Sequence, residues 1–316
     1  EAVTRIYSKN KAYTGLQYST RLYVGDYAFS NSIEALAQEA NGVKRIGVCR
    51  MDVDNLGQAF VAGFERPEKA TAQEREHFVT ISRTAAFSRQ MSLFFKCYIN
   101  DILSGRFESK PALAVTVVYS GGDDVFLLGA WNDVVEAALR IRQAFTVFSC
   151  GALTISAGLA LVDDHYPVRL SAAASGDLED LAKQEPDKDA VCLFESAHCY
   201  GWNTFTGRVL GEKKAALEAF FGARGQERGT AFLYRTLDLL RTAQDPKDGK
   251  LQLARYAYLL ARLEPPRTSP AFGAYRTFAD KMYRWALNKT DRAELITAIY
   301  LHVYENREGD TDGIQQ

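Results

Sequence analysis

The chain has 316 residues, of which 47% are hydrophobic and 24% are charged, and its formal net charge at pH 7 is -1. This composition is typical of a globular protein of about two domains, and it excludes a general electrostatic attraction to nucleic acid or to a membrane surface. Any contact with nucleic acid must therefore come from local patches or from partner subunits.

Targeting and metal-binding motifs are missing from the sequence. No apolar run reaches the roughly 18 residues that a membrane span requires, and no signal peptide opens the chain. The five cysteines form no CxxC pair, and the four histidines form no HExxH motif or His–Cys cluster. We therefore expect a cytoplasmic protein with reduced thiols, without a zinc site and without catalysis by histidine. Because the first residue is Glu1 rather than Met, we also expect a piece of a longer protein.

The first part of the chain, residues 1–40, is tyrosine-rich and irregular, and we expect it to be the end of an upstream linker domain. Its "NSIEALAQEANG" predicts one short helix, which Asn31 or Ser32 can cap.

Residues 41–200 alternate between strand-like and helix-like patterns. The predicted elements are, in order, a strand in "KRIGVCRMDVDN", a short helix in "LGQAFVAGF", a long helix from Phe78 to Leu103, two strands flanking "GGDD", a helix in "WNDVVEAALRIRQAFTVFS", a strand in "GALTISAGLALV", a helix in "YPVRLSAAASGDLEDLAKQE" and a last short strand in "DAVCLFE". This order predicts an α+β fold: a ferredoxin-like palm sheet with helices on one face.

Residues 201–316 contain amphipathic helical patterns, and we expect a separate all-α helical bundle. The tail "EGDTDGIQQ" predicts disorder.

Two pairs of acids follow predicted strands, Asp52 and Asp54 in "MDVDN" and Asp123 and Asp124 in "GGDD". In a ferredoxin-like sheet the end of the first strand can face the hairpin tip, so up to four carboxylates can converge. Unpaired, such a cluster is destabilised by repulsion and desolvation, whereas bound divalent cations stabilise it. Hard oxygen ligands favour Mg²⁺ or Mn²⁺, and the backbone carbonyl of Val53 can add another ligand. The alternative is an ordinary hairpin turn with exposed acids.

Four motifs together, "RMDVDNLGQAF", "SRTAAFSRQMSLFF", "VVYSGGDDVFLLGAW" and "LTISAGLAL", resemble the polymerase-like large subunit of type III CRISPR effector complexes, most closely its Csm-type branch. The resemblance covers most of residues 20–200. It implies the nucleotidyl cyclase type of palm, which binds ATP with Mg²⁺ or Mn²⁺ and joins AMP units into cyclic oligoadenylate when target RNA is bound. It also implies partners: a small subunit, a subunit that caps the guide end, guide RNA and target RNA.

Site residues follow from the resemblance position by position. Asp52 and Asp123 match the main metal ligands, with Asp54 and Asp124 in support.

The turn Ser120, Gly121 and Gly122 matches the segment that contacts nucleotide. Lys183 matches a lysine that meets the triphosphate, although it also fits a solvated helix lysine.

Family members carry two palm domains and usually an HD nuclease domain, and this chain has neither the first palm nor an HD motif. Two other functions stay open: a stand-alone cyclase that makes cyclic dinucleotides from GTP, and a nucleotide-binding scaffold without turnover.

Overall fold

The computed structural model describes residues 6–11, 19–66, 68–69, 71–72, 76–107, 109–222, 230–243 and 249–307. The chain divides into two compact units, one of Glu1–Ala40 with Lys44–Cys199 and one of Asn41–Val43 with Tyr200–Gln316. The assignment of residues 1–40 to an upstream linker domain stays a prediction, and the tail predicted to be disordered lies outside the described residues.

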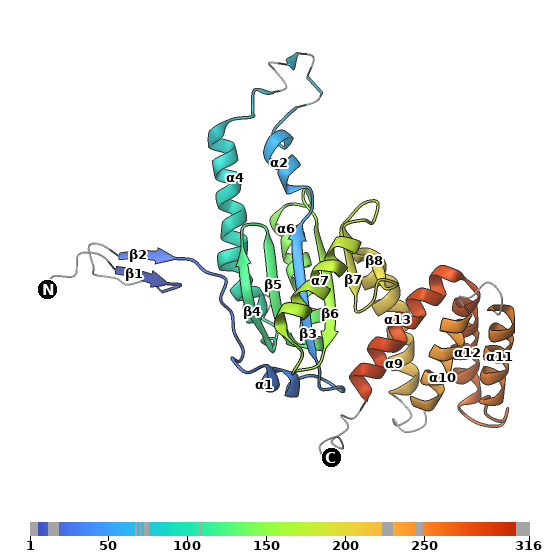
Figure 1. Cartoon of the computed structure of the whole chain (residues 1–316). Coiled ribbons are helices and arrows are strands. Elements are labelled where there is room, and N and C mark those ends of the chain that lie inside the picture. The colour runs from blue at the N-terminus through green and yellow to red at the C-terminus, as the bar shows by residue number, and fades with distance from the viewer. Residues whose placement is uncertain are drawn as a thin grey trace. The chain divides into compact units, whose positions relative to one another are not determined.

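The first unit is built on a six-stranded mixed sheet with the strand order β4-β5-β3-β6-β7-β8 (Figure 1). Its strands are β3 (Ile46–Val53), β4 (Val115–Gly121), β5 (Asp124–Ala130), β6 (Ile155–Val162), β7 (Ala190–Leu193) and β8 (Cys199–Gly201). β3 pairs antiparallel with both β5 and β6, which is the ferredoxin-like arrangement that the sequence predicts. The sequence missed β8, because three residues are too few for a periodic pattern.

The helices of this unit are α1 (Ile33–Gln38), α2 (Leu56–Ala62), α4 (Ile81–Leu93), the π-helix η1 (Phe94–Tyr98), α5 (Ile99–Leu103), α6 (Trp131–Phe148) and α7 (Val168–Ala182). Ser32 caps α1 by accepting a hydrogen bond from the backbone N–H of Ala35 at 3.3 Å. The long helix predicted from Phe78 to Leu103 is a continuous run that starts later, after the N-cap Thr80, and contains the π turn.

The π turn lets two consecutive aromatic residues enter the core. Phe94 and Phe95 are both buried, and their ring centroids lie 5.2 and 6.0 Å from that of Phe145 on α6. Both rings therefore pack against α6 from this turn of the helix.

The helices cover both faces of the sheet, so the prediction of helices on one face is wrong. A Cβ at Gly47 would meet Trp131 and Val134 of α6, whereas a Cβ at Gly158 would meet the α7 backbone. Gly158 pairs with Arg50, which is three residues after Gly47 on β3, and strand residues an odd number apart face opposite sides. α7, which connects the parallel strands β6 and β7, therefore packs on the face opposite α6.

Residues 1–40 were predicted to be irregular apart from one short helix, but they also contain two short parallel strands, β1 (Ile6–Lys9) and β2 (Ser19–Leu22). The segment after β2 lies along the outer edge of β4. The Val117 N–H donates to the Tyr27 carbonyl at 2.8 Å, and the Phe29 N–H donates to the Val115 carbonyl at 3.0 Å. This contact covers part of an otherwise open sheet edge.

The second unit is helical beyond β8, as the sequence predicts. Its helices are α8 (Trp202–Thr204), the π-helix η2 (Phe205–Lys214), α9 (Ala215–Phe221), α10 (Thr230–Thr242), α11 (Gly249–Arg262), α12 (Phe272–Leu287) and α13 (Lys289–Asn306). Within the described residues, none of the helices has the length and the apolar character that crossing a membrane requires.

Packing of α7 against the sheet depends on the missing side chain at position 158. A Cβ there would lie 2.2 Å from both the Glu179 nitrogen and the Ser175 carbonyl oxygen, which are backbone atoms that cannot yield. We expect Gly158→Ala to lower the free energy of unfolding by about 3 kcal/mol, measured by chemical denaturation. Gly57→Ala is the matched control, because an added Cβ meets nothing within 4 Å on α2. The proposed packing is wrong if both variants are equally stable.

Candidate active site

The end of β3 and the tip of the β4–β5 hairpin meet at one edge of the sheet. Asp52 is the register partner of Asp124, so the two carboxylates lie on the same face. The backbone N–H of Val53 donates to the carbonyl of Asp123 at 3.2 Å, which holds the hairpin tip against the end of β3. The structure thus brings together three of the four predicted acids, Asp52, Asp123 and Asp124.

The hairpin turn is shorter than the four residues of the GGDD motif. Gly121 and Asp124 pair with each other as strand residues, so the loop consists of Gly122 and Asp123 alone. Of these two, Gly122 has a positive φ of 70°, as in the type II′ turn that suits a hairpin. A Cβ at Gly122 would meet nothing within 4 Å, so the face above the turn is open.

Lys183 faces this acidic group from the C-cap of α7. Its ammonium group contacts a carboxylate oxygen of Asp52 and lies 2.7 Å from the Glu179 carboxylate. Arg50 lies two residues before Asp52 on the same strand face, with its Nε 3.6 Å from Glu179. The opposite face of the sheet contributes none of these charges.

The pKa values reflect an excess of negative charge. Burial raises the pKa of Asp123, and Asp52 raises it further. Burial also raises the pKa of Asp124, with added repulsion from Asp123 and Asp52. Burial alone would lower the pKa of Lys183, but its hydrogen bonds to Asp52 and Glu179 outweigh that effect and raise it.

Four carboxylates, of Asp52, Asp123, Asp124 and Glu179, therefore share two cations, Arg50 and Lys183. When all six groups are ionised, the formal charge of the site is -2, which one divalent cation would neutralise. The donor set of carboxylate oxygens fits Mg²⁺ or Mn²⁺.

Asp54 has different surroundings from the other acids. Its side chain is buried, and its oxygens accept hydrogen bonds from Thr154 Oγ1 at 2.8 Å, Ser156 Oγ at 2.9 Å and the Asp189 N–H at 3.1 Å. These bonds join the end of β3 to β6 and to the loop before β7. Asp54 as a metal ligand stays a prediction, since the structure already uses both of its oxygens.

Ser120 also turns away from the open face. Its hydroxyl is buried and donates to the Phe95 carbonyl at 2.6 Å, which attaches the hairpin to the π-helix η1. A hydroxyl used in this way positions the turn, and contact between Ser120 and nucleotide stays a prediction.

A cavity of about 480 Å³ opens between α2, α4 and the end of α6. Three phenylalanine rings, Phe64, Phe87 and Phe148, contribute to its walls, and Leu153 lies next to Thr154, a hydrogen-bond partner of Asp54. Its volume and apolar lining suit a small organic ligand.

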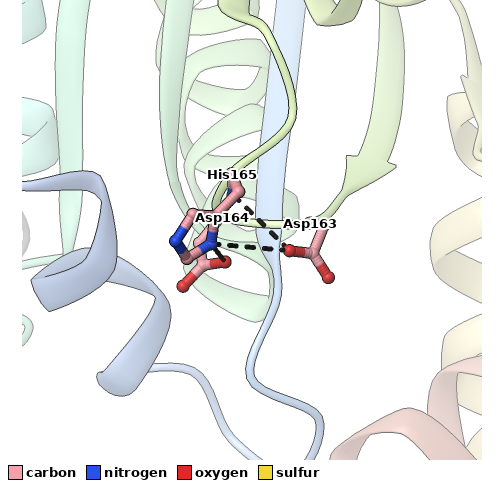
Figure 2. A group of neighbouring side chains, drawn as sticks. All are labelled: Asp163, Asp164 and His165. Carbon is pink, nitrogen blue, oxygen red and sulfur yellow. Dashed lines mark hydrogen bonds and ion pairs between the residues drawn. The ribbon is translucent and has the colours of Figure 1, made fainter. Parts of the chain in front are cut away.

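A second group of possible metal ligands lies elsewhere. Asp163, Asp164 and His165 follow β6, and among the described residues they alone bring three acid or histidine ligand atoms within 4.8 Å of one another (Figure 2). His165 Nδ1 lies 2.6 Å from Asp164, and the resulting hydrogen bond raises the pKa of the exposed imidazole. Val162 pairs with Ile46 at the start of β3, so this group lies about 23 Å along the strand from Val53.

The sequence analysis missed Arg50 and Glu179, although the spacing of each from a predicted site residue could have identified it. Glu179 precedes Lys183 by four residues, which places the two side chains on one helix face. Arg50 and Asp52 are two residues apart on a strand, which places them on one sheet face. The hydrogen-bond partners of Asp54 had no such signal, because about a hundred residues separate them from it.

The fold and the acidic group define a palm domain followed by a helical domain. Residues 45–192 match the family model of the Cas10/Cmr2 second palm domain, and residues 218–308 match that of the second helical domain of the Cmr2 subunit of the CRISPR RNA silencing complex. The chain belongs to the Cas10/Csm1 family of CRISPR proteins.

Two relatives are named as the CRISPR system single-strand-specific deoxyribonuclease Cas10/Csm1 of subtype III-A. The Mycobacterium tuberculosis protein is 40% identical over 98% of this chain, and the Enterococcus italicus protein is 39% identical over 97%. The match covers 37% of each relative, so the chain spans a little over a third of their length.

Solved structures show the same fold. Csm1 of T. onnurineus superposes with a TM-score of 0.71 at 24% identity, covering 96% of this chain and 44% of the other. A Csm1-Csm4 cassette in complex with AMPPNP has a TM-score of 0.63 at 26% identity, covering 93% and 43%. A Csm1-Csm4 cassette in complex with cA3 has a TM-score of 0.65 at 25% identity, covering 93% and 42%.

Stability measurements can distinguish Asp54, whose hydrogen bonds stabilise the fold, from Asp124, whose charge is repelled by the neighbouring carboxylates. Asp54→Ala leaves the donors of Thr154, Ser156 and Asp189 without their acceptor, so we expect it to lower the free energy of unfolding by about 3 kcal/mol. Asp124→Asn removes a repelling charge, so we expect its thermal midpoint to equal or exceed that of the unchanged chain. If Asp124→Asn destabilised as much as Asp54→Ala, the two acids would share a structural role.

Proposed function

We propose that the chain is the nucleotidyl-transfer module of a type III CRISPR effector subunit and joins AMP units of ATP into cyclic oligoadenylate. The observation that carries this proposal is the meeting of Asp52, Asp123 and Asp124 at one sheet edge, with an excess of negative charge. In the reaction a 3'-hydroxyl forms a bond to the α-phosphorus of a second ATP, and the bond to the β-phosphate breaks to release pyrophosphate.

Asp52 and Asp123 are the proposed main ligands of Mg²⁺ or Mn²⁺, with Asp124 and the Val53 carbonyl in support. Such a metal would stabilise charge on the phosphate oxygens and help to activate the attacking hydroxyl. Metal binding would compete with Lys183 for Asp52, and the ammonium group would then be free to meet the triphosphate. Gly122 leaves room for phosphate above the turn, and the aromatic cavity between α2, α4 and the end of α6 is the proposed place of the base.

The relatives support the class of substrate and the partners. Csm1-Csm4 cassettes with AMPPNP and with cA3 have the fold of this chain. We therefore propose ATP as the substrate and a Csm4-type subunit, a small subunit, guide RNA and target RNA as partners within a cytoplasmic complex. Since the chain spans about a third of its relatives, turnover is expected only with the remaining parts of the subunit.

The test is synthesis from α-labelled ATP with Mn²⁺, after the chain is combined with the rest of the subunit, its partners and target RNA. We expect Asp123→Ala/Asp124→Ala to lower labelled oligoadenylate by about 100-fold or more, because the variant removes two of the proposed ligands. The matched control is Asp163→Ala/Asp164→Ala, which removes two acids from the distant loop and should keep full activity.

Unchanged synthesis by the Asp123/Asp124 variant would contradict the site, and loss in the Asp163/Asp164 variant would move it to that loop. Products from GTP rather than ATP would favour a stand-alone cyclase. Binding of ATP without turnover in the complete assembly would favour a scaffold.

A further inference from the structure

The second unit has a groove whose charge differs from that of the whole chain. The groove has a volume of about 280 Å³ and lies between α10 and α11, which pack side by side (Figure 1). Its floor is Leu239 and Leu259, and its rim is Arg235, Asp238, Arg255, Tyr258 and Arg262.

The three arginines of the rim are exposed and, among the described residues, form no ion pair, although Asp238 lines the same groove. In the part of the chain that the structure describes, Arg235, Arg255 and Arg262 form no ion pair, and Arg255 donates only to the neutral Gln252, at 3.4 Å. Two other cations of the same unit behave differently. Lys213 lies 2.7 Å from Glu294, and Lys214 lies 2.7 Å from Glu305. The rim therefore presents guanidinium groups that the unit's own acids leave unneutralised.

The sequence around the groove is also basic. Between Gly249 and Leu287 there are two acidic residues and seven basic ones, namely Lys250, Arg255, Arg262, Arg267, Arg276, Lys281 and Arg284. Residues 249–287 therefore carry a positive net charge, although the net charge of the whole chain is -1. Among the described residues that line the groove, Asp238 is the one acid.

An exposed aromatic ring lies between two of the arginines. Arg255, Tyr258 and Arg262 follow one another at intervals of three and four residues, so they share one face of α11. The two arginines are about 10 Å apart along the helix axis. Tyr258 has 68% of its surface exposed. This is the combination that single-stranded nucleic acids use: cations for phosphates and a ring on which a base can stack.

We propose that the groove between α10 and α11 binds a segment of single-stranded nucleic acid, with Arg235, Arg255 and Arg262 on its phosphates and a base stacked on Tyr258. An acidic protein surface is the competing partner. Protein interfaces are also enriched in arginine and tyrosine, but nucleic-acid interfaces are more polar and much more positively charged. A rim of three unpaired arginines around a narrow floor of two leucines matches the second pattern.

The test measures fluorescence anisotropy of labelled single strands of about 12 nucleotides, in parallel as RNA and as DNA, with the full chain at several salt concentrations. We expect Arg255→Glu/Arg262→Glu to weaken binding at least about tenfold and to lower the slope of log affinity against log salt by about 1.4. Arg276→Glu/Arg284→Glu makes the same charge change at exposed residues of α12 outside the groove and should weaken binding clearly less than the groove variant does.

Two single changes probe the other groups on the rim. Tyr258→Ala should weaken binding and leave the salt slope unchanged, because stacking releases no counterions. Asp238→Asn should tighten binding, because it removes the one acid that repels phosphate. All these positions are exposed, so circular dichroism and the thermal midpoint should match those of the unchanged chain.

Tighter binding of RNA than of DNA would assign the groove to RNA, and the reverse would assign it to DNA; both support the proposal. The proposal is overturned if the unchanged chain binds neither strand at low salt. It is also overturned if the α12 variant loses as much affinity as the groove variant. Tighter binding of labelled polyglutamate through the same arginines would overturn it in favour of an acidic protein partner.

Discussion

The antiparallel register of β3 and β5 is the constraint on which the candidate site depends. It sets Asp52 opposite Asp124 and lets the Val53 N–H hold the hairpin tip. Burial raises the pKa of Asp124, and repulsion from the neighbouring carboxylates of Asp123 and Asp52 raises it further. The pairing of the strands holds the carboxylates close together despite their repulsion. A site proposed to bind a cation needs this arrangement, at a cost in stability.

The face of the sheet that carries the acids is defined by α7. Because Gly158 has no side chain, the α7 backbone packs directly on β6, and the helix ends with Lys183 against Asp52. Asp54 lies near these charges but bonds to Thr154 and Ser156 of the neighbouring strand segment. Asp54 thus stabilises the edge of the sheet, while Asp52, Asp123 and Asp124 keep an excess of negative charge that a cationic ligand can neutralise.

The second unit uses its cations in two opposite ways. In the second unit, Lys213 is fully buried against Glu294 and lies beneath the Trp285 ring, so its charge serves the packing of the helices. The arginines between α10 and α11 are exposed and unpaired among the described residues. A formal net charge near zero conceals this separation, because it sums paired and unpaired groups alike.

The sequence alone determined the local features of this protein. Apolar periodicity predicted the strands and helices of the palm and the helical domain after it, and "GGDD" predicted the turn, because these properties depend on near neighbours. Only the tertiary structure decided the rest. It placed α7 on the opposite face, directed both oxygens of Asp54 and the hydroxyl of Ser120 into structural hydrogen bonds, and set Lys183 against Asp52. Strand alternation specifies the face on which a side chain lies, but the partner it meets there comes from a distant part of the chain.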